Sequence, residues 1–191
     1  MRTIKKVASH IFIDGFGGMT QGLFATLIIG TMIQQIGLLI GGSTGNVIYL
    51  LGKAAAALTS AGIGVGVAVK YGESPLVTVS AAVAAMVGGY AGKITGGTFF
   101  VDGNAVLAGP GEPLGAFIAA FAGITCGHLV SGKTKVDIIV TPVITIGAGS
   151  VVGLLVGPPI SQMMTGLGSI INWATEQRPF IMGIVVSVVM G

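Results

Sequence analysis

Long apolar stretches without charged residues alternate along this chain with short segments that carry the charges. The two longest uncharged stretches run from Asp14 to Lys53 and from Asp137 to Glu176. About 20 apolar residues in a helix cross the roughly 30 Å of hydrocarbon in a bilayer. The pattern therefore predicts five membrane-spanning helices, at residues 19–39, 47–69, 75–92, 114–130 and 138–156.

Two more apolar segments follow the fifth predicted helix. Residues 157–175 begin with Pro158-Pro159 and carry no charge, which suits either a broken sixth helix or a re-entrant hairpin. Residues 180–191 would span only about 18 Å as a helix, which is too short for a crossing. We therefore expect one transmembrane domain over residues 1–191 that is incomplete at its C-terminus.

Composition places this pattern in a membrane. Hydrophobic residues make up 52% of the chain and charged residues only 8%, with a mean hydropathy of +0.96. An ordinary soluble domain has about 25% charged residues, and 8% would not cover its surface. The predicted fold class is an all-α integral membrane protein. It is a polytopic bundle of about five to seven transmembrane segments, with broken or re-entrant segments around GPGEP and VGPP.

The glycines indicate how such helices would pack. The chain has 34 glycines, and many recur four residues apart, a spacing that lets helices approach closely in lipid. Gly149, Gly153 and Gly157 form one such stripe. Packing within one chain is favoured over a homo-oligomer seam there, although a homo-oligomer is expected overall. The single Cys126 lies in a predicted span and has no partner for a disulfide or a metal site.

Basic residues predict the orientation in the membrane, because Lys and Arg accumulate in cytoplasmic loops. A cytoplasmic N-terminus places six basic residues inside and leaves two outside, with Lys53 undecided. The inside set is Arg2, Lys5, Lys6, Lys70, Lys133 and Lys135, and the outside set is Lys93 and Arg178. The loop at residues 93–104 is thereby predicted outside.

A lone carboxylate, Glu112, lies within the sequence GPGEP, and no other charged residue occurs between Asp102 and Lys133. An ionisable group between apolar stretches is costly unless it faces a polar cavity. The surrounding prolines and glycines would break a helix and free backbone polar groups, as at transporter substrate sites. A solute or ion site is favoured, and the alternatives are a structural salt bridge to Lys53 or Lys93 and simple loop exposure.

The candidate site is built around this segment. The predicted solute-binding residues are Glu112, Gly109, Gly111, Pro113 and Asn104, and the secondary candidates are His128, Asp102 and Pro158. For His128, a position at the membrane interface is favoured over a relay. No phosphate-binding loop, dinucleotide motif or His/Cys cluster is present, so no catalytic residue, cofactor, metal ion or nucleic-acid partner is predicted.

Four segments resemble the membrane-embedded enzyme IIC-like family of the bacterial phosphotransferase system. They are QGLFATLIIGT (21–31), GPGEPLGAFIAAFAG (109–123), LVSGKTKVDIIVTP (129–142) and LVGPPIS (155–161). GPGEP is also similar to the family motif of a glycine, two residues and Glu-Pro, whose glutamate contacts the sugar. By that match Glu112 is the position that would bind solute.

The resemblance implies a permease-like subunit in the bacterial cytoplasmic membrane. It would bind a sugar or polyol and present it to IIA- and IIB-type phosphocarrier subunits. The chain itself has no domain with a phosphorylatable cysteine or histidine of the kind those partners carry. Two other functions stay open from the residues alone: a proton- or ion-coupled secondary transporter that uses Glu112, and a membrane sensor of the same fold that transports nothing.

Overall fold

The computed structural model describes residues 10–101, 104–107, 109–176 and 187. Its helices in chain order are η1 (His10–Gly15), α2 (Phe16–Leu23), η2 (Phe24–Ile28), α3 (Ile29–Ile40), α4 (Gly42–Ala57), α5 (Thr59–Lys70), α6 (Pro75–Gly89), α7 (Ala91–Thr95), α8 (Pro113–Val130) and α9 (Asp137–Glu176). Two short antiparallel strands, β1 (Phe100–Val101) and β2 (Asn104–Ala105), form a hairpin between α7 and α8.

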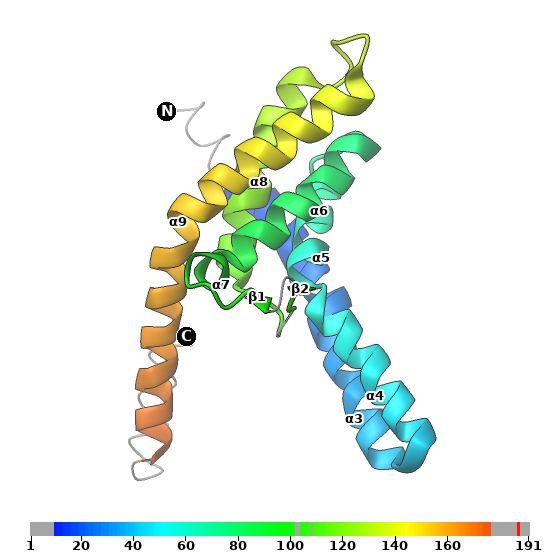
Figure 1. Ribbon diagram of the computed structural model, residues 1–191, viewed down its shortest axis with the longest axis vertical. Coiled ribbons are helices and arrows are strands. Elements are labelled where there is room, and N and C mark those ends of the chain that lie inside the picture. Colours follow the sequence, from blue (N-terminus) through cyan, green and yellow to red (C-terminus); the bar gives the residue numbers. More distant parts are fainter. Residues whose placement is uncertain (1–9, 102–103, 108, 177–186, 188–191) are drawn as a thin grey trace.

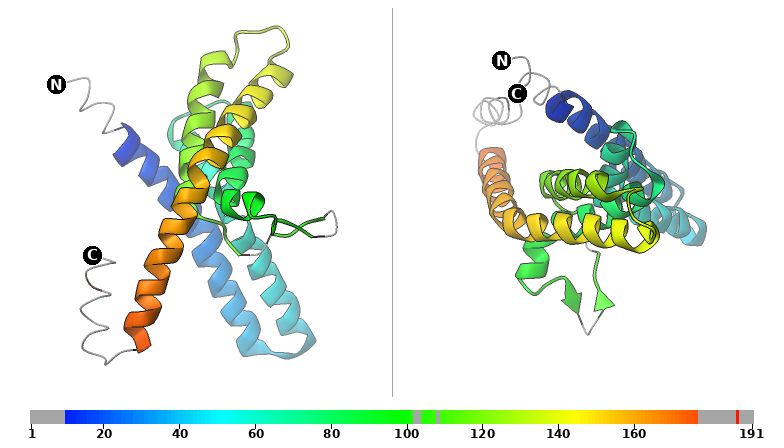
Figure 2. Two further views of the ribbon diagram at one scale, coloured as in Figure 1. Left: turned by 60° about the vertical axis from the view of Figure 1, so that its left-hand side comes forward. Right: turned by 90° about the horizontal axis from the view of Figure 1, so that it is seen from above.

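A bundle of α5, α6, α8 and the first half of α9 forms the centre of the molecule, and α2 packs against α5 (Figure 1). Two arms diverge from it: the hairpin of α3 and α4, and the second half of α9 (Figures 1 and 2). The core of the bundle consists mainly of small side chains, alanines above all, with Ile63, Val67 and Phe117 among the larger ones.

Local sequence explains where two of the central helices begin. Ser74 is the N-cap of α6, and its side chain accepts a hydrogen bond from the backbone N–H of Val77 at 3.4 Å. Pro75 and Pro113 each follow an N-cap residue as the first residue of α6 and α8. Proline suits this place because it needs no intrahelical partner for an N–H.

Glycines bring these helices into close contact, and the contacts are within the chain. A Cβ added to Gly153 of α9 would lie 2.8 Å from the Cα of Gly88 in α6. Gly149 packs likewise against α8, and Gly157 against Ala91 of α7. The stripe at 149, 153 and 157 thus packs inside the subunit, as favoured from the sequence, and is not available as a seam between two copies.

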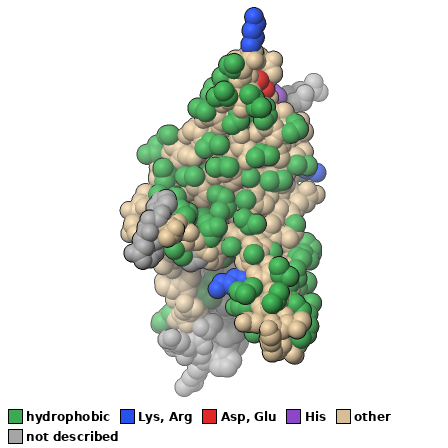
Figure 3. Space-filling view, turned by 45° about the vertical axis from the view of Figure 1, so that its right-hand side comes forward, with side chains coloured by type: hydrophobic (Ala, Val, Ile, Leu, Met, Phe, Trp, Pro, Cys, Tyr) green, Lys and Arg blue, Asp and Glu red, His purple; other side chains and the backbone are tan. Residues whose placement is uncertain are grey.

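The all-α membrane architecture is confirmed. Among the described residues, three helices are long and apolar enough to cross a bilayer: Ile13–Ile40, Pro113–Val130 and Asp137–Trp173. A fourth span is present if α4 and α5, which meet at a 53° bend, count as one. Many large hydrophobic side chains are exposed, and on the face drawn in Figure 3 charged side chains are few and scattered.

Within the part of the chain that the structure describes, the number of spans is lower than the sequence suggests, for two reasons. Helix α6 has only 15 residues, and α9 is one continuous helix of 40 residues that contains Pro142, Pro158 and Pro159. The predicted break at VGPP is therefore wrong. The two adjacent prolines remove backbone N–H donors from only one turn of the helix. Contacts with α7 support α9 at this turn. The helix therefore changes direction there without ending (Figure 1). The predicted segment 180–191 lies outside the described residues.

Candidate functional site

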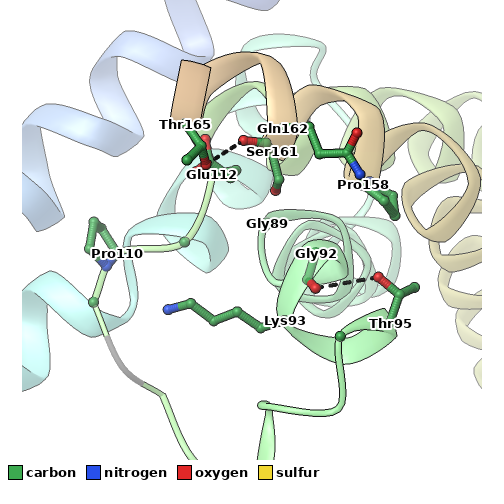
Figure 4. A pocket seen from close by; sticks show the side chains of 13 residues that line it. Gly89, Gly92, Lys93, Thr95, Pro110, Glu112, Pro158, Ser161, Gln162 and Thr165 are labelled. Carbon is green, nitrogen blue, oxygen red and sulfur yellow. Dashed lines mark hydrogen bonds between the residues drawn. The ribbon is translucent and has the colours of Figure 1, made fainter. Parts of the chain in front are cut away.

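A pocket of about 850 Å³ lies where the loop before α8 meets the ends of α6 and α7 and the middle of α9 (Figure 4). Its lining residues are Gly89, Gly92, Lys93, Thr95, Gly96, Gly109, Pro110, Gly111, Glu112, Pro158, Ser161, Gln162 and Thr165. The polar groups include one carboxylate, one ammonium, three hydroxyls and one amide. Segments distant in sequence therefore converge on Glu112.

The loop from Gly109 to Glu112 forms one side of this pocket, and glycine determines its path. Gly109 and Gly111 have φ values of 80° and 74°, in the left-handed region where side chains with a Cβ are strained. Gly111 also lies so close to Ser60 that an added Cβ would be 2.5 Å from the Ser60 Oγ. The motif GPGEP thus makes a tight turn that presses onto the start of α5.

Three hydrogen bonds fix this loop to the bundle. The Ser60 hydroxyl donates to the carbonyl of Pro110 at 2.9 Å. The backbone N–H of Glu112 donates to the carbonyl of Gly89 at 2.7 Å. The Tyr90 hydroxyl lies within hydrogen-bond distance of the carbonyl of Gly109. As a result, the carboxylate is carried on a braced loop at the N-cap of α8.

Charge in the pocket comes from Glu112 and Lys93. Glu112 precedes the span that begins at Pro113. Burial raises the pKa of the Glu112 carboxyl above its ordinary value of 4.5, and the positive charge of Lys93 lowers it in part. The Lys93 Nζ also lies 5.3 Å from the centre of the Tyr90 ring, a cation–π distance. Of the two basic partners considered for Glu112, Lys93 lines the pocket, whereas Lys53 is exposed on α4.

Helix α9 supplies the wall that faces this loop. Ser161, Gln162 and Thr165 follow the proline pair at the pocket surface (Figure 4). The Thr165 hydroxyl donates to the carbonyl of Ser161 at 2.8 Å, which leaves its oxygen as an acceptor toward the pocket. Together with Glu112 and Lys93, this wall offers donors and acceptors to a ligand that carries several hydroxyl groups.

The structure separates the candidate residues into two groups. Gly109, Gly111, Glu112 and the secondary candidate Pro158 line the pocket together. Pro113 is the first residue of α8 and Asn104 lies exposed in β2, and neither is part of the lining. Asp102 lies outside the described residues.

His128 lies at the opposite end of α8 from Glu112. The two residues are 16 positions apart (128 − 112), or roughly 24 Å along a helix. The His128 Nδ1 is 3.0 Å from a carboxylate oxygen of Glu73, and the imidazole is 71% exposed. The structure therefore places His128 in an exposed contact with the loop between α5 and α6, away from the pocket.

Sequence reasoning did not select Ser161, Gln162 and Thr165. They lie about fifty positions after Glu112, and no local motif joins them to it. The available signal was the spacing of Ser161 and Thr165, four residues apart on one face of an apolar helix directly after Pro158-Pro159.

Comparison with known proteins identifies the family of the chain. The family model described as "Phosphotransferase system, EIIC" matches residues 13–191. None of the curated proteins matches the chain, and no solved structure does. Because the match covers nearly the whole chain, the protein belongs to the EIIC family of the phosphotransferase system, the permease-like membrane components of that system.

Proposed function

We propose that this chain binds a sugar or polyol beside Glu112, as the solute-binding membrane subunit of a phosphoenolpyruvate-dependent phosphotransferase system. The observation that carries the proposal is the position of the carboxylate. Glu112 is the acidic residue among the pocket's lining residues, on a braced loop and opposite the hydroxyl and amide groups of α9. The EIIC family match supports the sugar class.

The chemistry of the pocket suits a polyhydroxylated solute. An ionised carboxylate accepts hydrogen bonds from two hydroxyl groups at once, while Lys93 and Gln162 supply donors. The volume of about 850 Å³ is within the usual range of small-molecule sites. Burial by a bound solute would also strengthen these polar interactions, because water would be displaced from between the charges.

The phosphoryl group would come from a partner. In this scheme a phosphorylated IIB-type subunit approaches from the cytoplasm and transfers its phosphoryl group to a hydroxyl of the solute, whose proton is released. A phosphorylated IIA-type subunit then transfers a new phosphoryl group to the IIB-type subunit. The subunit would work as a homo-oligomer in the bacterial cytoplasmic membrane, with the N-terminus in the cytoplasm.

Equilibrium dialysis of the purified chain against a radiolabelled panel tests this function. The panel consists of glucose, N-acetylglucosamine, maltose, cellobiose, mannitol and galactitol. We expect saturable binding of at least one member and competition by its unlabelled form. A charge-assisted hydrogen bond contributes about 1.5–3 kcal/mol, so Glu112→Gln should weaken that binding roughly 10- to 100-fold. Binding of no member, or equal binding by the variant, would contradict the proposal.

Transport in proteoliposomes separates the phosphotransferase role from ion-coupled transport. If solute accumulates in response to an imposed proton gradient without any phosphorylated partner, the coupling is secondary transport at the same site. Release of phosphorylated solute only when phosphorylated IIA and IIB proteins are supplied supports the proposed coupling. Binding without flux under either condition is the outcome expected of a sensor.

A further inference from the structure

Tyr90 lies where three segments of the chain meet. It follows α6 directly and exposes only 1% of its surface. Its hydroxyl is 3.2 Å from the carbonyl oxygen of Ala57, the last residue of α4, and still closer to the carbonyl of Gly109 in the pocket loop. One side chain therefore connects the break between α4 and α5 with the segment that carries Glu112.

The hydroxyl has one proton for these two carbonyls. Burial raises the pKa of the Tyr90 phenol, which keeps it protonated and able to donate. The carbonyl of Gly109, in the pocket loop, is one acceptor. The carbonyl of Ala57 is the second acceptor, at the end of a helix where carbonyl groups need partners outside the helix.

The loop is held at successive points between Gly109 and Glu112. Tyr90 holds the first residue, Ser60 holds Pro110, and Gly89 holds the backbone N–H of Glu112. The Tyr90 ring packs against the ring of Phe99, with ring centres 5.4 Å apart. The Lys93 ammonium lies over the face of the Tyr90 ring. Tyr90 thus contacts both Lys93 and the loop that carries Glu112.

We propose that Tyr90 is a positioning residue of the solute site, whose hydroxyl sets the place of Glu112 by holding the Gly109–Glu112 loop on the α4–α5 break. This rests on the proposed function, in which Glu112 binds solute. It extends that function to a residue outside the pocket lining and to the 53° bend between α4 and α5. A change of that bend would move the second acceptor of Tyr90 relative to the loop.

The test removes the hydroxyl and keeps the ring. In Tyr90→Phe, hydrogen exchange measured on the full chain by mass spectrometry should become faster for the backbone amides of Gly109, Gly111 and Glu112. Exchange within α8 should stay as in the wild type. Affinity for the panel solute that the wild type binds should fall about 2- to 10-fold, the usual effect of one lost hydrogen bond.

Tyr49→Phe is the matched control, because Tyr49 lies on α4 and not in the pocket lining. It should change neither loop exchange nor affinity. A double-mutant cycle then shows whether Tyr90 acts through the carboxylate. In the Glu112→Ala background, Tyr90→Phe should cause no further loss of affinity, whereas a general structural defect would cause the same loss in both backgrounds.

Three results would overturn the positioning role: unchanged loop exchange in Tyr90→Phe, faster loop exchange with wild-type affinity, or an equal loss of affinity with and without Glu112. A failure of the proposed function looks different. In that case Glu112→Ala itself binds solute as the wild type does, whatever the exchange measurement shows for Tyr90.

Discussion

The backbone N–H of Glu112 and the carbonyl of Gly89 form a hydrogen bond of 2.7 Å, which ties the N-cap of α8 to the last residue of α6. This bond uses main-chain atoms only. A substitution of the Glu112 side chain therefore leaves the anchor of the loop in place. The charge of the carboxylate can thus be tested separately from the path of the backbone.

For Glu112→Gln, we expect a melting temperature equal to that of the wild type or higher, because the variant removes a partly buried charge. A structural salt bridge with Lys93 predicts a lower melting temperature, because the ammonium would lose its partner. Glu73→Gln is the control for charge removal, since Glu73 pairs with His128 at the other end of α8. Wild-type solute affinity with a lowered melting temperature in Glu112→Gln would assign Glu112 to structure instead.

Acidity should affect binding and stability in opposite directions. The pKa of Glu112 is raised in the folded protein, so stability from this group is present at low pH and is lost as pH rises through that pKa. In the proposed function the solute binds the ionised carboxylate, so binding should strengthen as pH rises from the ordinary value of 4.5 through the raised pKa of Glu112. The stability change should be small because the group is partly solvated.

This prediction is tested by measuring dissociation constants by dialysis, and melting temperatures, at a series of pH values from 4.5 upward. Glu112→Gln should abolish the pH dependence of binding and remove the contribution of Glu112 to the pH dependence of stability. If the variant keeps the pH dependence of binding, another group, or the solute itself, is responsible for it.

Gly153→Leu should destabilise the bundle, because its side chain would enter the contact with Gly88 and Ala119, where even a Cβ is closer than 3.0 Å. Overpacking of this kind costs about 1–3 kcal/mol. Gly147→Leu is the matched control on the same helix, since a Cβ at Gly147 meets nothing within 4 Å. Thermal unfolding in detergent compares the two variants. Equal melting temperatures would show that α9 does not pack on α6 in this way.

The predicted orientation places the loop after α8 in the cytoplasm and the segment after α7 outside. In a variant with Cys126→Ser, single cysteines at the exposed positions Val136 and Thr98 report on these two segments. A membrane-impermeant maleimide should label Val136→Cys only in inverted vesicles and Thr98→Cys only in intact cells. Labelling of both from one face would refute the topology.

Apolar runs and their charged boundaries were sufficient to locate α8 and most of α3 to α6, because a bilayer imposes length and composition on each crossing. The non-helical conformation of residues 109–112 was also predictable, since two glycines with positive φ and two prolines determine the loop locally. The segment follows β2, however, and does not interrupt a helix, contrary to expectation. These features depend on residues close together in the chain.

The continuity of α9 was not predictable in this way. Pro158 and Pro159 locally indicate a break, but the contact of Gly157 with Ala91 is a tertiary interaction. The same holds for Tyr90, whose importance comes from carbonyls 33 residues before it and 19 residues after it. Ser161, Gln162 and Thr165 line the pocket because the second half of α9 lies beside the loop that carries Glu112. No short sequence motif indicates that arrangement.

The length of α9 has a consequence for how the protein lies in lipid. Its 40 residues extend about 60 Å, twice the hydrocarbon thickness of a bilayer. Its later half still exposes Met163, Ile170 and Trp173, which would be unfavourable in water. An upright rod of this length would leave that half outside the hydrocarbon. The change of direction near the proline pair instead lets the helix enter along one line and continue obliquely within the same layer, with the pocket around Glu112 at the bend.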